Sequence, residues 1–220
     1  NCGEGVQTSE ENPATLYVML PPATYSALSI DVVTTDGVIS KQLNGSYTVK
    51  RVVATTSEEA LSSGTIVADF TTLTLGEQSE ASPRTWKAGA EIGIFSENSK
   101  NTKFSLAASS AGKAQGEFVG AASTGAVTAY YPYSANATLV DGVLTLTAND
   151  TQLYNSDLLA QFVDSTPFMV AQGEEGADLS FEYAMGVVGV RVCADIKVKY
   201  ITLSSAKPLA GKLLVDTANG

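Results

Sequence analysis

The chain has 220 residues, 44% of them hydrophobic, which is enough for one large or two small domains with their own cores. Its net charge of -10 would repel nucleic-acid phosphates and anionic lipids, so we expect neither as a partner. No apolar run approaches the roughly 18 residues of a spanning helix, so no transmembrane segment is expected. Only 16% of residues are charged, and Thr, Ser, Gly and Ala replace them, which favours short strands joined by turns.

The first part of the chain predicts strands separated by prolines and turn residues. Residues 16–20 form an apolar run between prolines, and residues 25–32 alternate polar and apolar side chains, which indicates one buried face. Residues 35–37 (Thr-Asp-Gly) are a hairpin signal, after which we expect residues 46–53 to pair back. The polar residues 54–64 are expected to form a linker.

The remainder of the chain also predicts short strands. Residues 65–75 form a long alternating strand, followed by a Gly/Ser/Pro-rich loop at residues 76–83. No segment has a long 3.6-residue period, and the only helical turn we expect lies at residues 157–162. This spacing predicts an all-β protein with sandwich architecture. Further strands are expected at residues 91–95, 103–107, 116–119, 126–130, 142–147, 179–184, 187–192, 196–204 and 212–215.

The absence of histidine limits the catalytic chemistry that the chain can perform. It excludes the Ser-His-Asp triad, the Cys-His pair and His-ligated zinc. Paired carboxylates remain, as in glycosidases, but the acidic pairs at residues 10–11, 58–59 and 174–175 lie in polar, turn-like stretches. Such stretches predict solvated charges, because a catalytic carboxylate needs a sheltered site. We therefore expect no enzyme, and no catalytic, cofactor-binding or metal site.

The two cysteines, Cys2 and Cys193, form neither a disulfide framework nor a zinc pattern. One interpretation is that both are small buried hydrophobic residues. The other is a single disulfide in an oxidising compartment, and the sequence leaves both open.

Four motifs distributed over most of the chain are specific only when taken together. They are residues 85–95 (TWKAGAEIGIF), residues 129–134 (AYYPYS) preceded by Phe118, residues 166–171 (TPFMVA) followed by residues 179–181 (LSF), and residues 17–25 (YVMLPPATY). Together they resemble the fimbrillin family of Bacteroides-type bacteria, which includes fimbrial shaft and tip subunits and related surface lipoproteins. Ala90 stands where the family usually has Asp, so any role of that Asp is absent.

This resemblance implies a fold of two transthyretin-like, Greek-key β-sandwiches and a non-enzymatic subunit that assembles by strand exchange. It also implies an exported protein of the cell surface, outer membrane or fimbrium that acts in cell adhesion. Its partners would be other fimbrial subunits or itself, and a host or bacterial receptor or glycan. A carbohydrate-binding surface module is the alternative function, and a β-sandwich glycan hydrolase is a third.

The order of the motifs differs from that of the family, because the segment like residues 17–25 comes late there. Either the chain is written in permuted order, or it spans the end of one tandem unit and the start of the next. We favour permutation, because the two parts then sum to one two-domain unit. The expected parts are an N-terminal-type sandwich at residues 64–193, a C-terminal-type sandwich at residues 194–220 plus 1–57, and a linker at residues 54–64.

Permutation also predicts a contact between the two ends of the chain. Residues 213–220 would form a hairpin with residues 2–6. Gly220 would then lie near Asn1.

The aromatic residues of the motifs are the candidate ligand contacts. Tyr130 and Tyr133 could stack on a sugar. Strand alternation places Tyr131 and Tyr133 on one face and Tyr130 on the other, so at least one of them is expected in the core. Trp86 is expected to be a core anchor.

Two further sets of candidate residues depend on the resemblance. Ser165 and Thr217 lie in short acidic-hydroxyl patterns on which such bacteria O-glycosylate exported proteins. The first strand of the family order is the candidate assembly strand, which would pair through main-chain hydrogen bonds. Its residues are Thr65, Val67, Asp69, Thr71, Leu73 and Leu75.

Overall fold

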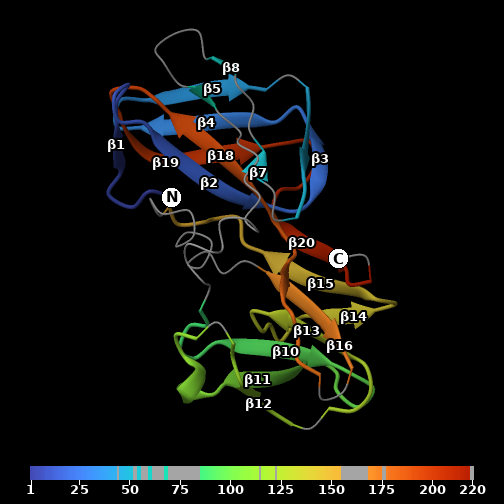
Figure 1. Cartoon of the computed structure of the whole chain (residues 1–220). Helices are drawn as coiled ribbons and strands as arrows, with labels where there is room; N and C mark the ends of the chain where they lie inside the picture. Colours follow the sequence, from blue (N-terminus) through green and yellow to red (C-terminus); the bar gives the residue numbers. More distant parts are fainter. Residues whose placement is uncertain are drawn as a thin grey trace. The chain divides into compact units, whose positions relative to one another are not determined.

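The computed structural model describes residues 1–43, 45–51, 54–55, 59–60, 67–68, 85–113, 115–121, 123–154, 168–174 and 177–218. Within these residues the elements are β-strands and one short 3₁₀ helix, η1 (Ala108–Ser110), which confirms the all-β prediction. The chain divides into two compact units by its internal contacts (Figure 1). The first unit comprises Asn1–Thr74, Asn149–Thr166 and Met185–Gly211, and the second Leu75–Ala148, Pro167–Ala184 and Lys212–Gly220.

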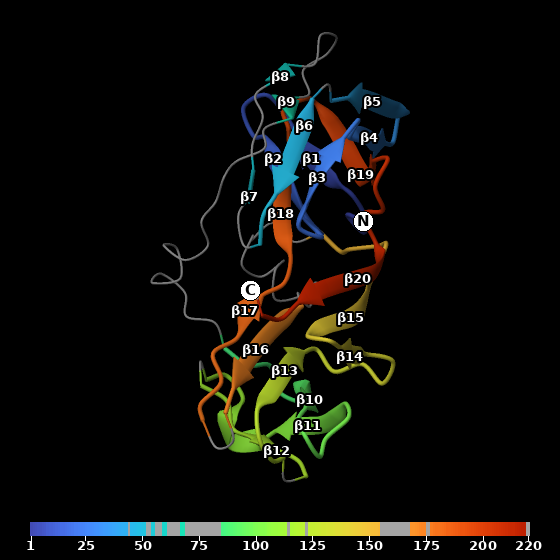
Figure 2. The same cartoon turned by 90° about the vertical axis from the view of Figure 1, so that its right-hand side faces the viewer.

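Among its described residues, the first unit contains two larger sheets and two strand pairs. One sheet has the order β1 (Val6–Thr8), β19 (Ile196–Ser204), β4 (Ser29–Thr34) and β5 (Val38–Gln42), and all of its neighbours are antiparallel. The other has the order β2 (Ala14–Leu20), β18 (Gly186–Val192) and β7 (Ala54–Thr55), with β7 parallel to β18. The pairs are β3 (Ala23–Ser26) with β6 (Ser46–Val49), side by side in Figure 2, and β8 (Glu59–Ala60) with β9 (Val67–Ala68).

The core of the first unit follows the alternation of its strands. In β4, Ile30, Val32 and Thr34 are buried and the residues between them are half-buried, so one face packs inward. The same hydrophobic cluster contains Leu16 and Leu20 of β2 and three valines of β18. Tyr25 of β3 is fully buried, and its hydroxyl donates a hydrogen bond to the Pro21 carbonyl at 2.7 Å.

Two local predictions in this unit are corrected. Residues 25–32 are not one strand, because Ala27 adopts a positive φ of 55° and the chain changes sheet between β3 and β4. The hairpin at residues 35–37 is confirmed, with the Thr34 N–H donating to the Gly37 carbonyl at 2.8 Å. The returning strand is β5 rather than residues 46–53, since such a short turn pairs the residues that directly follow it, and β6 joins β3.

The described part of the second unit forms two sheets, and Figure 2 shows the three strands of the smaller one side by side. All of the pairs with a described register are antiparallel. The larger sheet has the order β12 (Phe118–Val119), β11 (Thr102–Leu106), β10 (Glu91–Phe95), β13 (Val127–Tyr131), β16 (Met169–Gly173) and β17 (Glu182–Tyr183). The smaller sheet has the order β14 (Thr138–Val140), β15 (Val143–Ala148) and β20 (Gly211–Asp216).

Two of the sequence motifs are neighbouring strands in the second unit. Gly93 of β10 lies opposite Tyr130 of β13, and a Cβ atom on Gly93 would overlap the Tyr130 ring. The Tyr130 hydroxyl is shared between the Asn101 Oδ1 at 2.6 Å and the Ser134 carbonyl at 2.8 Å. The glycine is therefore required by the close approach of the ring, which fills the space that a side chain would take.

On the other face of this sheet, Trp86 is the centre of an aromatic cluster. Its ring contacts those of Phe118, Tyr131 and Phe181 edge to face, with centroids 4.9, 5.4 and 5.5 Å away. Tyr131 also packs against the apolar cluster that contains Ile92 and its neighbours. Trp86, the expected core anchor, joins these three rings but is half-buried, so it lies at the border of the core rather than inside it.

One prediction for the chain ends is wrong, and several others fall on residues that the structure does not describe. The hairpin of residues 213–220 with residues 2–6 is wrong, because β20 pairs with β15 and β1 with β19. The Thr217 N–H donates to the Gly142 carbonyl at 3.0 Å, which fixes the end of β20 at the β14–β15 turn. Gly220, residues 157–162 and most of residues 65–75 lie outside the described residues.

The bounds of the two expected domains stay a prediction, and the two compact units are described here by themselves. β18 belongs to the first unit, and residues 212–218 belong to the second. Short strands occur at Ala54–Thr55 and Glu59–Ala60, within the stretch expected as a linker.

Candidate binding groove

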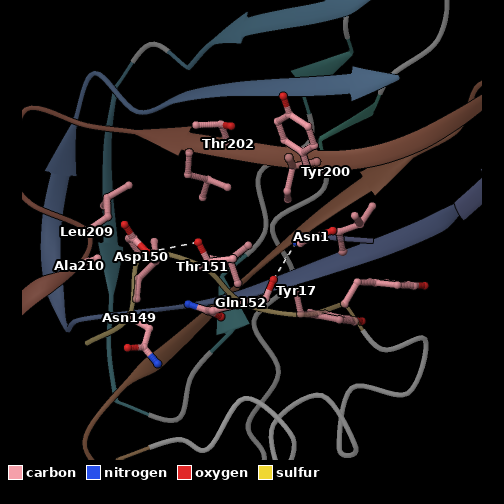
Figure 3. A pocket seen from close by; sticks show the side chains of 16 residues that line it. Asn1, Tyr17, Asn149, Asp150, Thr151, Gln152, Tyr200, Thr202, Leu209 and Ala210 are labelled. Carbon is pink, nitrogen blue, oxygen red and sulfur yellow. Dashed lines mark hydrogen bonds between the residues drawn. The ribbon is translucent and has the colours of Figure 1, made fainter. Parts of the chain in front are cut away.

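A cavity of about 290 Å³ opens in the first unit between β19 and the segment of residues 149–154. Figure 3 shows the polar residues of that segment along one wall, Tyr200 and Thr202 on β19, and Leu209 and Ala210 at one end. We call this cavity the groove. Its lining residues are Asn1, Leu16, Tyr17, Val18, Leu20, Asn149, Asp150, Thr151, Gln152, Tyr154, Tyr200, Ile201, Thr202, Leu203, Leu209 and Ala210.

The β19 side of the groove is an open sheet edge. β1 pairs only with Ile196–Val198, and the Cys2 N–H donates to the Lys199 carbonyl at 2.8 Å. Beyond this point, β4 is the only strand that pairs with residues 200–204 within the described part of the chain. No strand from the described residues therefore pairs with the edge opposite β4 along residues 200–204.

The register identifies which backbone groups face the open edge. The Thr34 N–H points to β5, where it bonds to Gly37, so by alternation Val33 and Asp31 point to β19. Their partners are Tyr200 and Thr202, which therefore bond to β4. The N–H and C=O groups of the alternate residues, Ile201 and Leu203, consequently point away from β4 toward the open edge.

The floor of the groove is part of the hydrophobic core. Leu16 and Leu20 of β2 are 3% and 2% exposed, and Ile201, Leu203 and Leu209 pack against the same cluster. In β19 the side chains of Tyr200 and Thr202 point to the other face, and Tyr200 is 45% exposed. A ligand in the groove would thus meet apolar side chains below it and backbone groups at its side.

Asn1 lines the groove and is bonded to the segment of residues 149–154. The Asn1 carbonyl accepts a hydrogen bond from the Tyr154 N–H at 2.8 Å, and Cys2 is bonded to β19. Burial raises the pKa of the Cys2 thiol and of the Tyr17 and Tyr154 hydroxyls above their usual values, so all three groups are neutral near pH 7.

The opposite wall is held on β2 by a side-chain amide. The Gln152 Oε1 accepts from the Met19 N–H at 2.9 Å, and the Gln152 Nε2 donates to the Met19 carbonyl at 2.8 Å. Among the lining residues that the structure describes, Asp150 is the one acidic side chain and none is Lys or Arg. The groove therefore suits an uncharged ligand with its own main-chain donors and acceptors.

The predicted ligand-contact residues do not lie in the groove, and they belong to the second unit. Tyr130 is fully buried, and burial raises the pKa of its hydroxyl. Tyr133 is half-buried, and the Lys103 Nζ lies 5.9 Å from its ring centroid. The structure thus places one of the two tyrosines in the core and does not bring them together on a surface.

Thr217 is 6% exposed, and its hydroxyl donates to the Gly142 carbonyl at 2.8 Å. The Gln172 Nε2 donates to the same hydroxyl at 3.0 Å, and a glycan on Thr217 would replace the hydrogen that this hydroxyl donates to Gly142. Ser165, Thr65, Asp69, Thr71, Leu73 and Leu75 lie outside the described residues, and Val67 lies in β9.

Within the described residues, no group of three or more His, Cys, Asp or Glu side chains is arranged to hold a metal ion. Cys2 and Cys193 are half-buried and not joined to each other. No helix of the described chain has the length and apolar character for crossing a membrane.

The comparisons with known proteins give no assignment: no protein-family model, no curated protein and no solved structure matches the chain. The function is therefore argued from the groove and the sequence motifs.

Proposed function

We propose that this protein is a non-enzymatic, exported surface subunit of the fimbrillin type that acts in cell adhesion. It assembles with other subunits or with itself by accepting a strand at the open edge of β19. The observation that carries this proposal is the groove, in which the free backbone groups of Ile201 and Leu203 lie beside an apolar floor.

Strand addition uses the two features that this groove combines. Main-chain hydrogen bonds to an open edge supply affinity, and pockets for alternate side chains supply specificity. Two outward residues offer four backbone bonds, each worth about 0.5–1.5 kcal/mol. Burying one apolar side chain on the Leu16–Leu20 floor adds about 1.5–3 kcal/mol.

The free energy from these hydrogen bonds and this burial is comparable to the entropic cost of association, which is about 4–15 kcal/mol. The groove alone is therefore expected to hold an isolated peptide weakly. Subunits would assemble stably through contacts that extend beyond it. The alternating residues 65–75 of a second copy are the proposed donor strand.

The proposed fold of each unit is a transthyretin-like sandwich. The support comes from the second unit, where the Ile-Gly-Ile-Phe motif in β10 pairs with β13, which holds the first two tyrosines of the Tyr-Tyr-Pro-Tyr motif. Two motifs far apart in the sequence form one packing unit there. A cell-surface or fimbrial location and a receptor or glycan partner follow from the same resemblance.

The proposal is tested by removing one outward N–H from the edge. Ile201→Pro deletes that donor, and proline is tolerated on an edge strand where its nitrogen faces outward. Ile201→Val is the matched control, because it also shortens the side chain but keeps the N–H. Sedimentation velocity over a range of concentrations measures self-association of the wild-type protein and both variants.

We expect wild type and Ile201→Val to form concentration-dependent oligomers, and Ile201→Pro to remain monomeric with unchanged far-ultraviolet circular dichroism. A wild-type protein that stays monomeric at all concentrations, or an Ile201→Pro variant that assembles like wild type, would refute strand acceptance at this edge.

A further inference from the structure

The segment of residues 149–154 contacts the edge of β2 through the side chain of Gln152. Gln152 makes two hydrogen bonds to one residue, accepting from the Met19 N–H at 2.9 Å and donating to the Met19 carbonyl at 2.8 Å. A neighbouring antiparallel strand would make the same two bonds with Met19 through its own N–H and C=O. The Gln152 amide thus replaces a strand at this point.

Met19 lies on an edge of its sheet with which no described strand pairs, so its backbone groups depend on the Gln152 amide for hydrogen bonds. β2 is an edge strand among the described residues, with β18 on its other side, where Met19 lies opposite Val187. Open edges accept strands from other chains unless they are covered. Met19 is 4% exposed, so its backbone groups would be left largely buried and unpaired without the amide.

We propose that Gln152 is a positioning residue that directs strand addition to β19, because it closes the edge of β2 at Met19 and holds the groove wall in place. The naming of β19 as the acceptor rests on the proposed function, whereas the closure of β2 does not. The Gln152 side chain therefore covers the edge of β2 at Met19. It also keeps open the groove beside the edge of β19.

Glutamine has the chemistry that this role requires. Its planar amide presents one acceptor and two donors, so it can match an N–H and a C=O of the same residue. Glutamate is ionised near pH 7 and only accepts, which places a carboxylate oxygen against the Met19 carbonyl. Methionine has a similar length but no donor, and asparagine is one methylene shorter.

The first test measures hydrogen exchange at the Met19 amide in the monomer, by nuclear magnetic resonance on the full chain. We expect Gln152→Met and Gln152→Glu to accelerate this exchange by at least about tenfold, because the amide loses its partner and the edge opens locally. Thr151→Val is the matched control, since its exposed side chain on the same segment bonds only to Asp150, at 3.2 Å. Gln152→Asn provides a further variant if one of the others folds poorly.

The second test locates the added strand by comparing protection in the monomer and in the associated protein. In wild type, association should protect the Ile201 amide and leave Met19 unchanged. In Gln152→Met, association should also protect Met19, because the β2 edge has become an acceptor.

Unchanged Met19 exchange in every monomeric Gln152 variant would overturn the closure of β2. Association of Gln152→Met that protects Ile201 alone would overturn its directing role. A wild-type protein that never associates refutes the proposed function instead, and the exchange rate of Met19 in the monomer still decides whether Gln152 closes β2.

Discussion

Replacing Gly93 by alanine tests the packing of the second unit, because the new methyl group has no space. Its Cβ would overlap the Tyr130 ring, which is fully buried between its neighbours. The ring must therefore move. Its hydroxyl then loses the acceptors Asn101 Oδ1 and Ser134 O, and also the Ser134 N–H, which donates to it at 3.1 Å.

The expected cost follows from these contacts. Overpacking a core costs about 1–3 kcal/mol, and the loss of one donated and one accepted hydrogen bond adds about 1 kcal/mol each. Part of this loss is offset, because alanine loses less conformational entropy on folding than glycine, which stabilises a strand by roughly 0.5–1 kcal/mol. We expect Gly93→Ala to lower the free energy of unfolding of the second unit by about 2–4 kcal/mol.

The assay is urea unfolding followed by tryptophan fluorescence. Trp86 is the only tryptophan of the chain and lies in the second unit, so its emission reports that unit. A double-mutant cycle with Tyr130→Leu provides the control, because the smaller side chain leaves space for the methyl group. In that background Gly93→Ala should cost less than about 0.5 kcal/mol.

The packing argument fails if Gly93→Ala alone has wild-type stability. It also fails if the substitution costs the same with and without the Tyr130 ring.

Two further predictions concern a buried hydroxyl in each unit. Thr217→Val should destabilise the second unit by about 1–3 kcal/mol, because the Gln172 amide loses its acceptor and the Gly142 carbonyl loses one of its two donors, whereas Thr217→Ser keeps the hydroxyl and most of the stability. Urea unfolding by Trp86 fluorescence measures both, and equal effects of Val and Ser would contradict the role of the hydroxyl. Burial raises the pKa of Tyr25 from 10.0 to about 12. Its contribution to the stability of the first unit is complete below pH 10 and is lost as the pH rises toward 12, because the unfolded state ionises first. Circular dichroism against urea over this pH range should show this loss, and Tyr25→Phe should reduce it.

Local strand patterns could be predicted well from the sequence. The strands at residues 91–95 and 196–204 were expected with the bounds that β10 and β19 have. β10 is a short apolar run, and β19 contains many β-branched residues, so each pattern depends on a few neighbouring side chains. The expectation that Tyr130 and Tyr131 lie on opposite faces of their strand agrees with their separate packing partners.

Sheet order could not be predicted in the same way, because it depends on segments far apart in the chain. Nothing in residues 25–32 indicates that the chain changes sheet at Ala27, where a positive φ ends one strand. The open edge of β19 likewise results from the short length of β1.

The groove was missed for this reason. Gln152 lies in a polar stretch that carries no motif, and its partner Met19 is 133 residues away. The prolonged alternation of β19 beyond the residues that β1 covers is the one sequence signal that could have indicated an unpaired edge.

Hydrogen exchange at Ile201 and Leu203 tests the central claim most directly. Both amides point to the open edge, so we expect rapid exchange in the monomer and slow exchange in the associated protein, while the Tyr200 and Thr202 amides, which bond to β4, are protected in both. Ile201 and Leu203 amides that exchange equally fast in the monomer and in the assembly would contradict strand acceptance at β19.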